Sequence, residues 1–147
     1  MDEHIYKRHN KSLLLYHIVF PVKYRKSVIT GSVGIVLRDI CLGISERYEV
    51  CFVEIGYEED HVHFLIQSVP GLSVSEIIRV VKSITARELF FRCPHLEGQL
   101  WGGSFWTSGY YVNTVGSYGD KAMIQRYVEN QGNTYTKVYD GQLSLFE

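Results

Sequence analysis

The stretch VCFVEIGYEEDHVHFLIQSV, residues 50–69, determines the expected fold. Apolar residues alternate along its first half, which predicts a β-strand over residues 50–58. A second strand is expected over residues 61–69, and the cluster Glu58-Glu59-Asp60 between them favours a turn. The stretch therefore predicts a β-hairpin that carries two histidines, His61 and His63, at the start of its second strand.

The segments before and after this hairpin predict the remaining strands and helices. A strand is expected within residues 12–25, ending near Pro21, and apolar spacing predicts helices over residues 32–47 and 73–92. Ser73 and Glu76 form a capping box at the start of the second helix. A fourth strand over residues 105–115 and a short final helix over residues 120–131 follow. The order β-α-β-β-α-β-α predicts an α+β, ferredoxin-like split βαβ sandwich, an antiparallel sheet with helices on one face, plus a C-terminal helix.

Length and composition limit the classes of protein that fit. A chain of 147 residues with 46% hydrophobic residues is expected to form one globular domain over residues 1–147. Apolar runs are too short for a membrane span and no signal peptide is evident, so a cytoplasmic protein without membrane contact is expected. The three cysteines form no C-x-x-C pair, which argues against a zinc knuckle. Residues 133–147 match no motif and receive no role.

The two histidines of the hairpin are candidate metal ligands. Side chains two apart on a strand point to one face, so His61 and His63 could share an ion, although two solvated histidines are about as probable from this motif alone. A third ligand is needed. The final helix places Tyr127 and Gln131 one turn apart on its apolar stripe, and a glutamine there needs a polar partner.

These motifs together resemble a known family. HVHF (61–64), YVENQ (127–131), YHIVFPVKYR (16–25) and NTVGS (113–117) are similar to the corresponding motifs of the single-tyrosine HUH transposases of the smallest bacterial and archaeal insertion sequences. The resemblance covers residues 13–131. It implies that His61, His63 and Gln131 bind a divalent metal ion, Mg2+ or Mn2+, and that Tyr127 is the catalytic nucleophile.

The resemblance also implies a reaction and its partners. Such enzymes cut and rejoin single-stranded DNA through a 5′-phosphotyrosine intermediate and recognise DNA hairpins at the element ends. They are homodimers whose active sites are shared in trans. Here the aromatic strand expected at residues 105–115 is a poor solvated edge, which favours pairing of two copies, and Gly116 and Gly119 could form a hinge before the last helix.

Candidate DNA contacts follow from local charge, although the net charge is −1. The basic residues are Lys23, Arg25, Lys26, Arg79 and Lys82, and a solvated face is an equally good interpretation of them. Candidate aromatic platforms for unpaired bases are Tyr24, Trp101, Phe105, Trp106, Tyr110 and Tyr111, although most are expected in the core.

Three other interpretations stay open. One is a tyrosine transposase associated with repetitive extragenic palindromes, which is usually longer and more basic. Another is a DNA-binding regulator of the same fold that has lost catalysis, against which the intact residues His61, His63, Tyr127 and Gln131 argue. The last is an unrelated metal-binding enzyme, which would not need Tyr127.

Overall fold

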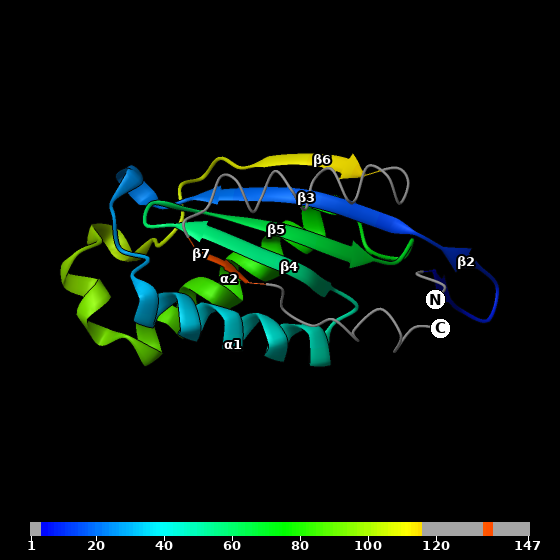
Figure 1. Ribbon diagram of the computed structural model, residues 1–147, viewed down its shortest axis with the longest axis horizontal. Coiled ribbons are helices and arrows are strands. Elements are labelled where there is room, and N and C mark those ends of the chain that lie inside the picture. The colour runs from blue at the N-terminus through cyan, green and yellow to red at the C-terminus, as the bar shows by residue number, and fades with distance from the viewer. Residues whose placement is uncertain (1–3, 116–133, 137–147) are drawn as a thin grey trace.

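One antiparallel sheet with two long helices on a single face organises the protein (Figure 1). The structure is a computed structural model and describes residues 4–115 and 134–136. Its elements are β1 (Ile5–Tyr6), β2 (Lys11–Ser12), β3 (Leu14–Pro21), α1 (Gly31–Arg47), β4 (Cys51–Glu58), β5 (His61–Ser68), α2 (Val74–Arg92), β6 (Tyr111–Val115) and β7 (Thr134–Thr136). Short 3-10 helices span Lys23–Arg25, Pro94–Gly98 and Trp101–Gly103.

The sheet confirms the expected ferredoxin-like arrangement. Its strand order is β6-β3-β5-β4-β7, and every neighbouring pair is antiparallel. The predicted hairpin is β4 and β5, with Glu58 paired to His61 across the turn. A separate two-stranded sheet of β1 and β2 precedes β3. Within the described ranges, no helix is both long and apolar enough to cross a membrane.

Both long helices begin at side-chain caps. The hydroxyl of Thr30 accepts a hydrogen bond from the backbone N–H of Val33 at the start of α1. The predicted capping box is present at α2, where Ser73 and Glu76 each bind the other's backbone N–H at 3.1 Å. These bonds satisfy donors that a helix start otherwise leaves free, and they fix where each helix begins.

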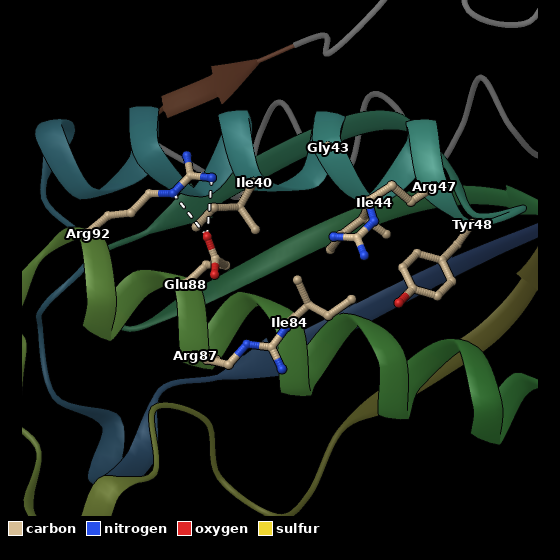
Figure 2. Close-up of a pocket in the computed structure, with 9 residues that line it drawn as sticks. All are labelled: Ile40, Gly43, Ile44, Arg47, Tyr48, Ile84, Arg87, Glu88 and Arg92. Atoms are coloured by element: carbon tan, nitrogen blue, oxygen red, sulfur yellow. Dashed lines mark hydrogen bonds and ion pairs between the residues drawn. The ribbon is translucent and has the colours of Figure 1, made fainter.

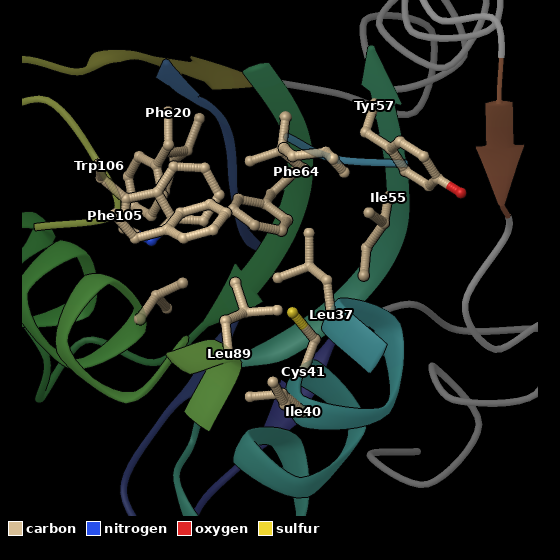
Figure 3. Packing of buried hydrophobic residues seen from close by; sticks show 14 of the residues in the cluster. Phe20, Leu37, Ile40, Cys41, Ile55, Tyr57, Phe64, Leu89, Phe105 and Trp106 are labelled. Atoms are coloured by element: carbon tan, nitrogen blue, oxygen red, sulfur yellow. The ribbon is translucent and has the colours of Figure 1, made fainter. Parts of the chain in front are cut away.

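The main core lies between the sheet and the helices (Figure 3). Alternate residues of β3 and β5 face the helices because side chains of a strand alternate between its two faces. Phe20 and Phe64 meet edge to face with ring centres 5.5 Å apart. The indole N–H of Trp106 donates to Oγ1 of Thr85 at 2.9 Å, which satisfies a polar group in this apolar setting.

The opposite face of the sheet combines apolar and polar side chains. Leu15, Val53, Leu65 and Val115 form a second buried cluster there. His17 and His63 occupy the same face, since they alternate with the core residues of their strands, and each is only 4% exposed. The imidazole rings of His17 and His63, polar groups that are common at protein surfaces, are therefore almost completely shielded from solvent.

The fourth strand is shorter than predicted. Residues 105–115 were expected to form it, but β6 begins at Tyr111. Phe105 and Trp106 are neighbours in sequence and both belong to the main core, whereas consecutive residues of a strand point to opposite faces of the sheet. Trp106 instead makes an isolated bridge to Val22. The predicted final helix lies outside the described residues.

Candidate functional site

His61 and His63 lie on one face at the start of β5, as their spacing predicts. Their neighbours on β3 are Pro21 and Val19. The two imidazole rings have centres 4.9 Å apart and planes inclined by 73°. Two imidazoles that bind one ion at about 2.1 Å would have ring centres roughly 5 Å apart, so the pair has a suitable spacing for a shared ion.

A carboxylate and an arginine orient His61. Nδ1 of His61 lies 2.7 Å from Oδ1 of Asp60, while the other oxygen of Asp60 accepts bonds from Nε and Nη2 of Arg25 at 3.1 and 3.0 Å. Burial alone would raise the pKa of Asp60, but the hydrogen bonds from His61 and Arg25 outweigh it, and the pKa is lowered. An ionised Asp60 accepts the Nδ1–H of His61, which leaves Nε2 as the nitrogen with the lone pair.

A third histidine contacts His63. Nε2 of His17 lies 3.2 Å from Nδ1 of His63, and the two rings are nearly parallel, with a 5° angle between them. On its other side, Nδ1 of His17 lies 3.2 Å from Oδ1 of Asn113. Burial, and after it the electrostatic interaction with His61 and His17, lowers the pKa of His63 to about 4, so its ring is neutral at physiological pH. Neutral imidazole is the form that binds a metal ion.

The described residues contain no complete metal site. Among residues 4–115 and 134–136, no three histidine, cysteine, aspartate or glutamate side chains are grouped to hold an ion. The two imidazoles nevertheless fit a divalent ion as neutral nitrogen ligands, with at least one further ligand required. Gly56, which has no side chain, pairs with His63 across β4 and β5.

Tyr127 and Gln131, the predicted nucleophile and third ligand, lie outside the described residues. The structure therefore brings together His61 and His63 alone of the four predicted catalytic and metal-binding residues. β7 begins at Thr134, shortly after Gln131, and Thr134 pairs with Tyr57 of β4 in the same chain. Tyr57 in turn pairs with Val62, the residue between the two histidines.

Three of the five predicted basic residues gather near the histidines. Lys23, Arg25 and Lys26 belong to a turn that directly follows β3, here called the basic turn (residues 23–26). Tyr24 and Arg25 have φ values of 58° and 53°, a left-handed conformation that non-glycine residues adopt at some cost. The bond from Arg25 to Asp60 ties this strained turn to His61.

The other two predicted basic residues lie on α2. Arg79 is exposed. The ammonium of Lys82 donates to the carbonyl oxygens of Thr107, Ser108 and Gly109 at 2.7, 3.0 and 3.3 Å, and burial lowers its pKa. These bonds use its three donors to hold the loop before β6, which disfavours the predicted contact of Lys82 with DNA.

The candidate aromatic platforms divide into two groups. Phe105 and Trp106 are buried in the main core and cannot stack on a base. Tyr24 and Trp101 are 68% and 75% exposed, and Tyr110 and Tyr111 are also exposed. The ammonium groups of Lys23 and Lys26 lie 5.4 and 5.7 Å from the ring centres of Tyr24 and Trp101 respectively. The basic turn and Trp101 thus combine positive charge with open aromatic faces.

A pocket between the two helices lies on the other side of the sheet from the histidines (Figure 2). Its lining includes Arg47, Arg87 and Arg92, but Arg92 is paired with Asp39 and Glu88. The pocket has no contact with the histidine face. It is not the candidate site.

Sequence reasoning missed His17, Asp60 and Asn113 as parts of the site. His17 alternates along β3 with the core residues Tyr16, Ile18 and Phe20, so it points to the opposite face of the sheet. This alternation could have identified it as an unusual polar residue on that face. Asp60 was assigned only to the turn. Asn113 carried no signal, because its pairing with His17 depends on the register between β3 and β6.

Comparison with known proteins identifies similar chains. Residues 10–131 match the profile of the family described as "Transposase IS200 like". The chain is 35% identical over 118 residues to the ISDra2 transposase TnpA of Deinococcus radiodurans, covering 80% of this chain and 84% of that one. It is also 35% identical over 120 residues to the transposase for insertion sequence element IS200 of Salmonella typhimurium, covering 79% and 75%.

Solved structures show the same fold. A crystal structure of a transposase from Deinococcus radiodurans superposes with a TM-score of 0.70 at 32% identity, covering 88% of this chain and 98% of that chain. A REP-associated tyrosine transposase bound to a REP hairpin superposes with a TM-score of 0.60 at 13% identity, covering 84% and 68%.

Proposed function

Because this chain belongs to the family of IS200-like transposases, we propose that it cuts and rejoins single-stranded DNA at the ends of an insertion sequence through a 5′-phosphotyrosine intermediate. The observation that carries the proposal is the pair His61 and His63. Their rings lie on one face of the sheet, and the distance between the ring centres suits a shared divalent ion. The family match covers residues 10–131 of this chain and so includes Tyr127 and Gln131. The higher identity to insertion-sequence transposases favours this role over that of a REP-associated enzyme.

In this proposal Tyr127 supplies the attacking oxygen. Its phenol oxygen forms a bond to the phosphorus, the bond from phosphorus to the 3′ oxygen breaks, and the phenol proton is transferred so that a free 3′-OH results. The phosphodiester energy is kept in the phosphotyrosine, so rejoining needs no ATP. A phenol has a pKa of about 10 and is a weak nucleophile near pH 7, so charge on the phosphate must be stabilised.

His61, His63 and Gln131 would hold the divalent cation, Mg2+ or Mn2+, which when bound supplies positive charge to the phosphate oxygens. All three ligands are neutral, so they leave the charge of the ion undiminished. Asp60 and Arg25 keep His61 turned with Nε2 toward the site. A mixed nitrogen and oxygen ligand set suits Mn2+, whereas Mg2+ prefers oxygen ligands and is expected to bind less tightly.

The basic turn and Trp101 are the proposed contacts for the DNA near the cut. Lysine side chains of the turn would contact phosphates, and the exposed ring of Trp101 would stack on an unpaired base. DNA hairpins are the proposed ligand outside the cut, as for the REP-associated transposase whose structure holds one. Arg79 is a further proposed backbone contact.

A homodimer with sites shared in trans is the proposed assembly. β6 is an edge of the sheet, and an edge strand can pair with its copy around a twofold axis. β7 begins three residues after Gln131 and pairs with β4 of its own chain, and the alternative is that each chain completes its own site. The two arrangements make opposite predictions for mixed dimers.

The test is incubation of the protein with single-stranded oligonucleotides from the flanks of its own gene, with Mg2+ or Mn2+, followed by denaturing electrophoresis. We expect a covalent protein–DNA adduct that chelation of the metal abolishes. Tyr127→Phe should still bind hairpin DNA and form no adduct. Adduct formation by Tyr127→Phe would assign the nucleophile to another tyrosine, with Tyr118 and Tyr135 the first to examine.

A further inference from the structure

Three polar side chains on three adjacent strands form a continuous chain on the face of the sheet that carries the histidine pair. Asn113 of β6 pairs directly with His17 of β3, and His17 lies diagonal to His63 of β5, whose partner on β3 is Val19. The links are Asn113 Oδ1 to His17 Nδ1 and His17 Nε2 to His63 Nδ1, both 3.2 Å. His63 therefore contacts a hydrogen-bonded pair that ends in an amide.

The amide of Asn113 has a defined orientation. Its Nδ2 lies 3.3 Å from the carbonyl oxygen of Thr114, which can only accept a hydrogen bond. The nitrogen must therefore face Thr114, and the oxygen faces His17. An amide oxygen can only accept, so the Nδ1 atom of His17 must carry the proton.

The orientation of the amide then determines the protons of both rings. His17 is only 4% exposed, and burial of a charged imidazolium ring is costly, so the ring carries a single proton. With that proton on Nδ1, Nε2 of His17 is an acceptor. Nδ1 of His63 must then donate to it, and the lone pair of His63 lies on Nε2.

We propose that Asn113 and His17 are positioning residues that fix His63 in the tautomer with Nδ1 protonated, so that Nε2 is the metal-binding atom. The inference rests on the proposed function for the presence of the ion. Asp60 gives His61 the same tautomer by a separate route, through its carboxylate. Both histidines thus offer Nε2 to the ion. The proton of His61 is placed by the charged carboxylate of Asp60 near the surface. The proton of His63 is placed by the neutral pair Asn113 and His17, here called the relay, in the buried layer of the sheet.

The difference between the two routes has a physical reason. His63 is 4% exposed, and a carboxylate beside it would be an expensive buried charge that also raises the pKa of the ring. The neutral side chains of Asn113 and His17 fix the position of the proton on His63 without adding a charge.

The experiment is a two-bond 1H–15N NMR correlation on the metal-free protein with 15N-labelled histidine, which distinguishes protonated Nδ1 from protonated Nε2. In the wild type we expect His17 and His63 both to be protonated on Nδ1. Asn113→Leu, at a half-buried position, removes the acceptor and should give mixed tautomers at both rings. Asn113→Asp keeps an acceptor oxygen and should keep Nδ1 of His17 protonated.

A Mn2+ titration by calorimetry provides the second readout. Asn113→Leu should weaken Mn2+ binding about tenfold, as loss of a partner behind a ligand does, whereas Asn113→Asp should stay much closer to the wild type. Thr114→Val is the matched control, because this side chain lies on the same strand but faces Tyr16 on the opposite face, and it should change neither readout.

Protonation of His63 on Nε2 in the metal-free wild type would overturn the relay, as would unchanged tautomers in Asn113→Leu. Failure of the proposed function has a different signature. In that case the tautomers would be as expected while no DNA adduct forms. A DNA adduct together with His63 protonated on Nε2 would reject the relay alone.

Discussion

The ring of Tyr57 lies against Gly34 of α1 so closely that a β-carbon at Gly34 would overlap the outer ring atoms and the hydroxyl oxygen. Tyr57 belongs to β4 and is 7% exposed, so the contact joins the first helix to the first strand of the histidine hairpin. A buried ring cannot swing away freely. The close approach therefore depends on the missing side chain of Gly34.

Gly34→Ala should destabilise the protein by about 1–3 kcal/mol, because the added methyl group forces a shift of Tyr57 or of α1. Urea unfolding of both proteins measures the change. Gly43→Ala on the same helix is the control, since no atom lies within 4 Å of the place that its new methyl group would occupy, and it should stabilise the protein by up to about 1 kcal/mol. Equal stability of Gly34→Ala and wild type would show that the helix adjusts at no cost.

Replacement of the two histidines should separate chemistry from folding. His61→Ala and His63→Ala should each abolish adduct formation, because one imidazole cannot hold the ion. His63→Ala should also lower stability by about 1–3 kcal/mol, since His63 is buried and its loss deprives His17 of a partner, whereas half-buried His61 should matter less. Gln131→Ala should weaken metal use more mildly, because water can replace an amide oxygen. A Mn2+ titration identical in wild type and the double alanine variant would show that the pair has only a structural role.

Substitutions near the basic turn should weaken DNA binding without unfolding the protein. Trp101→Ala should reduce affinity for single-stranded DNA by about 1–3 kcal/mol through lost stacking. Lys26→Ala should lower the slope of log affinity against log salt by about 0.7, the value for one phosphate contact on a single strand. Fluorescence anisotropy at several salt concentrations measures both effects.

Tyr48→Ala is the matched control for these substitutions. Tyr48 is also exposed and lies beside a cation, with Arg47 6.0 Å from its ring centre. It follows α1, at the end of the sheet away from the histidines. Equal losses for Tyr48→Ala and Trp101→Ala would indicate binding without a defined site.

Mixed dimers test whether the active site is shared. A Tyr127→Phe chain and a His61→Ala chain, each inactive alone, are unfolded together and refolded into heterodimers. A site shared in trans restores one complete site per heterodimer, with histidines from the first chain and tyrosine from the second. Confirmed heterodimers that form no adduct would rule out the trans arrangement and leave each chain to complete its own site.

The sequence predicted the elements whose signal is local. The β4–β5 hairpin followed from alternation around an acidic turn, and the start of α2 followed from Ser73 and Glu76. The relay from Asn113 to His63 could not be predicted, because a slip of one residue in strand register moves every side chain to the other face. β7 was missed because three residues give too little pattern, although Thr134-Tyr135-Thr136 has the composition of a strand.

The two edges of the sheet are unequal, and this inequality bears on how far copies of the protein can associate. β6 offers five residues of strand edge, whereas β7 offers three. Two chains that pair through β6 use both copies of the longer edge and leave only the two short ones facing outward. Short edges are poor templates for further strands. A pair formed through β6 would therefore be expected to stop at two copies and not to extend into a fibre.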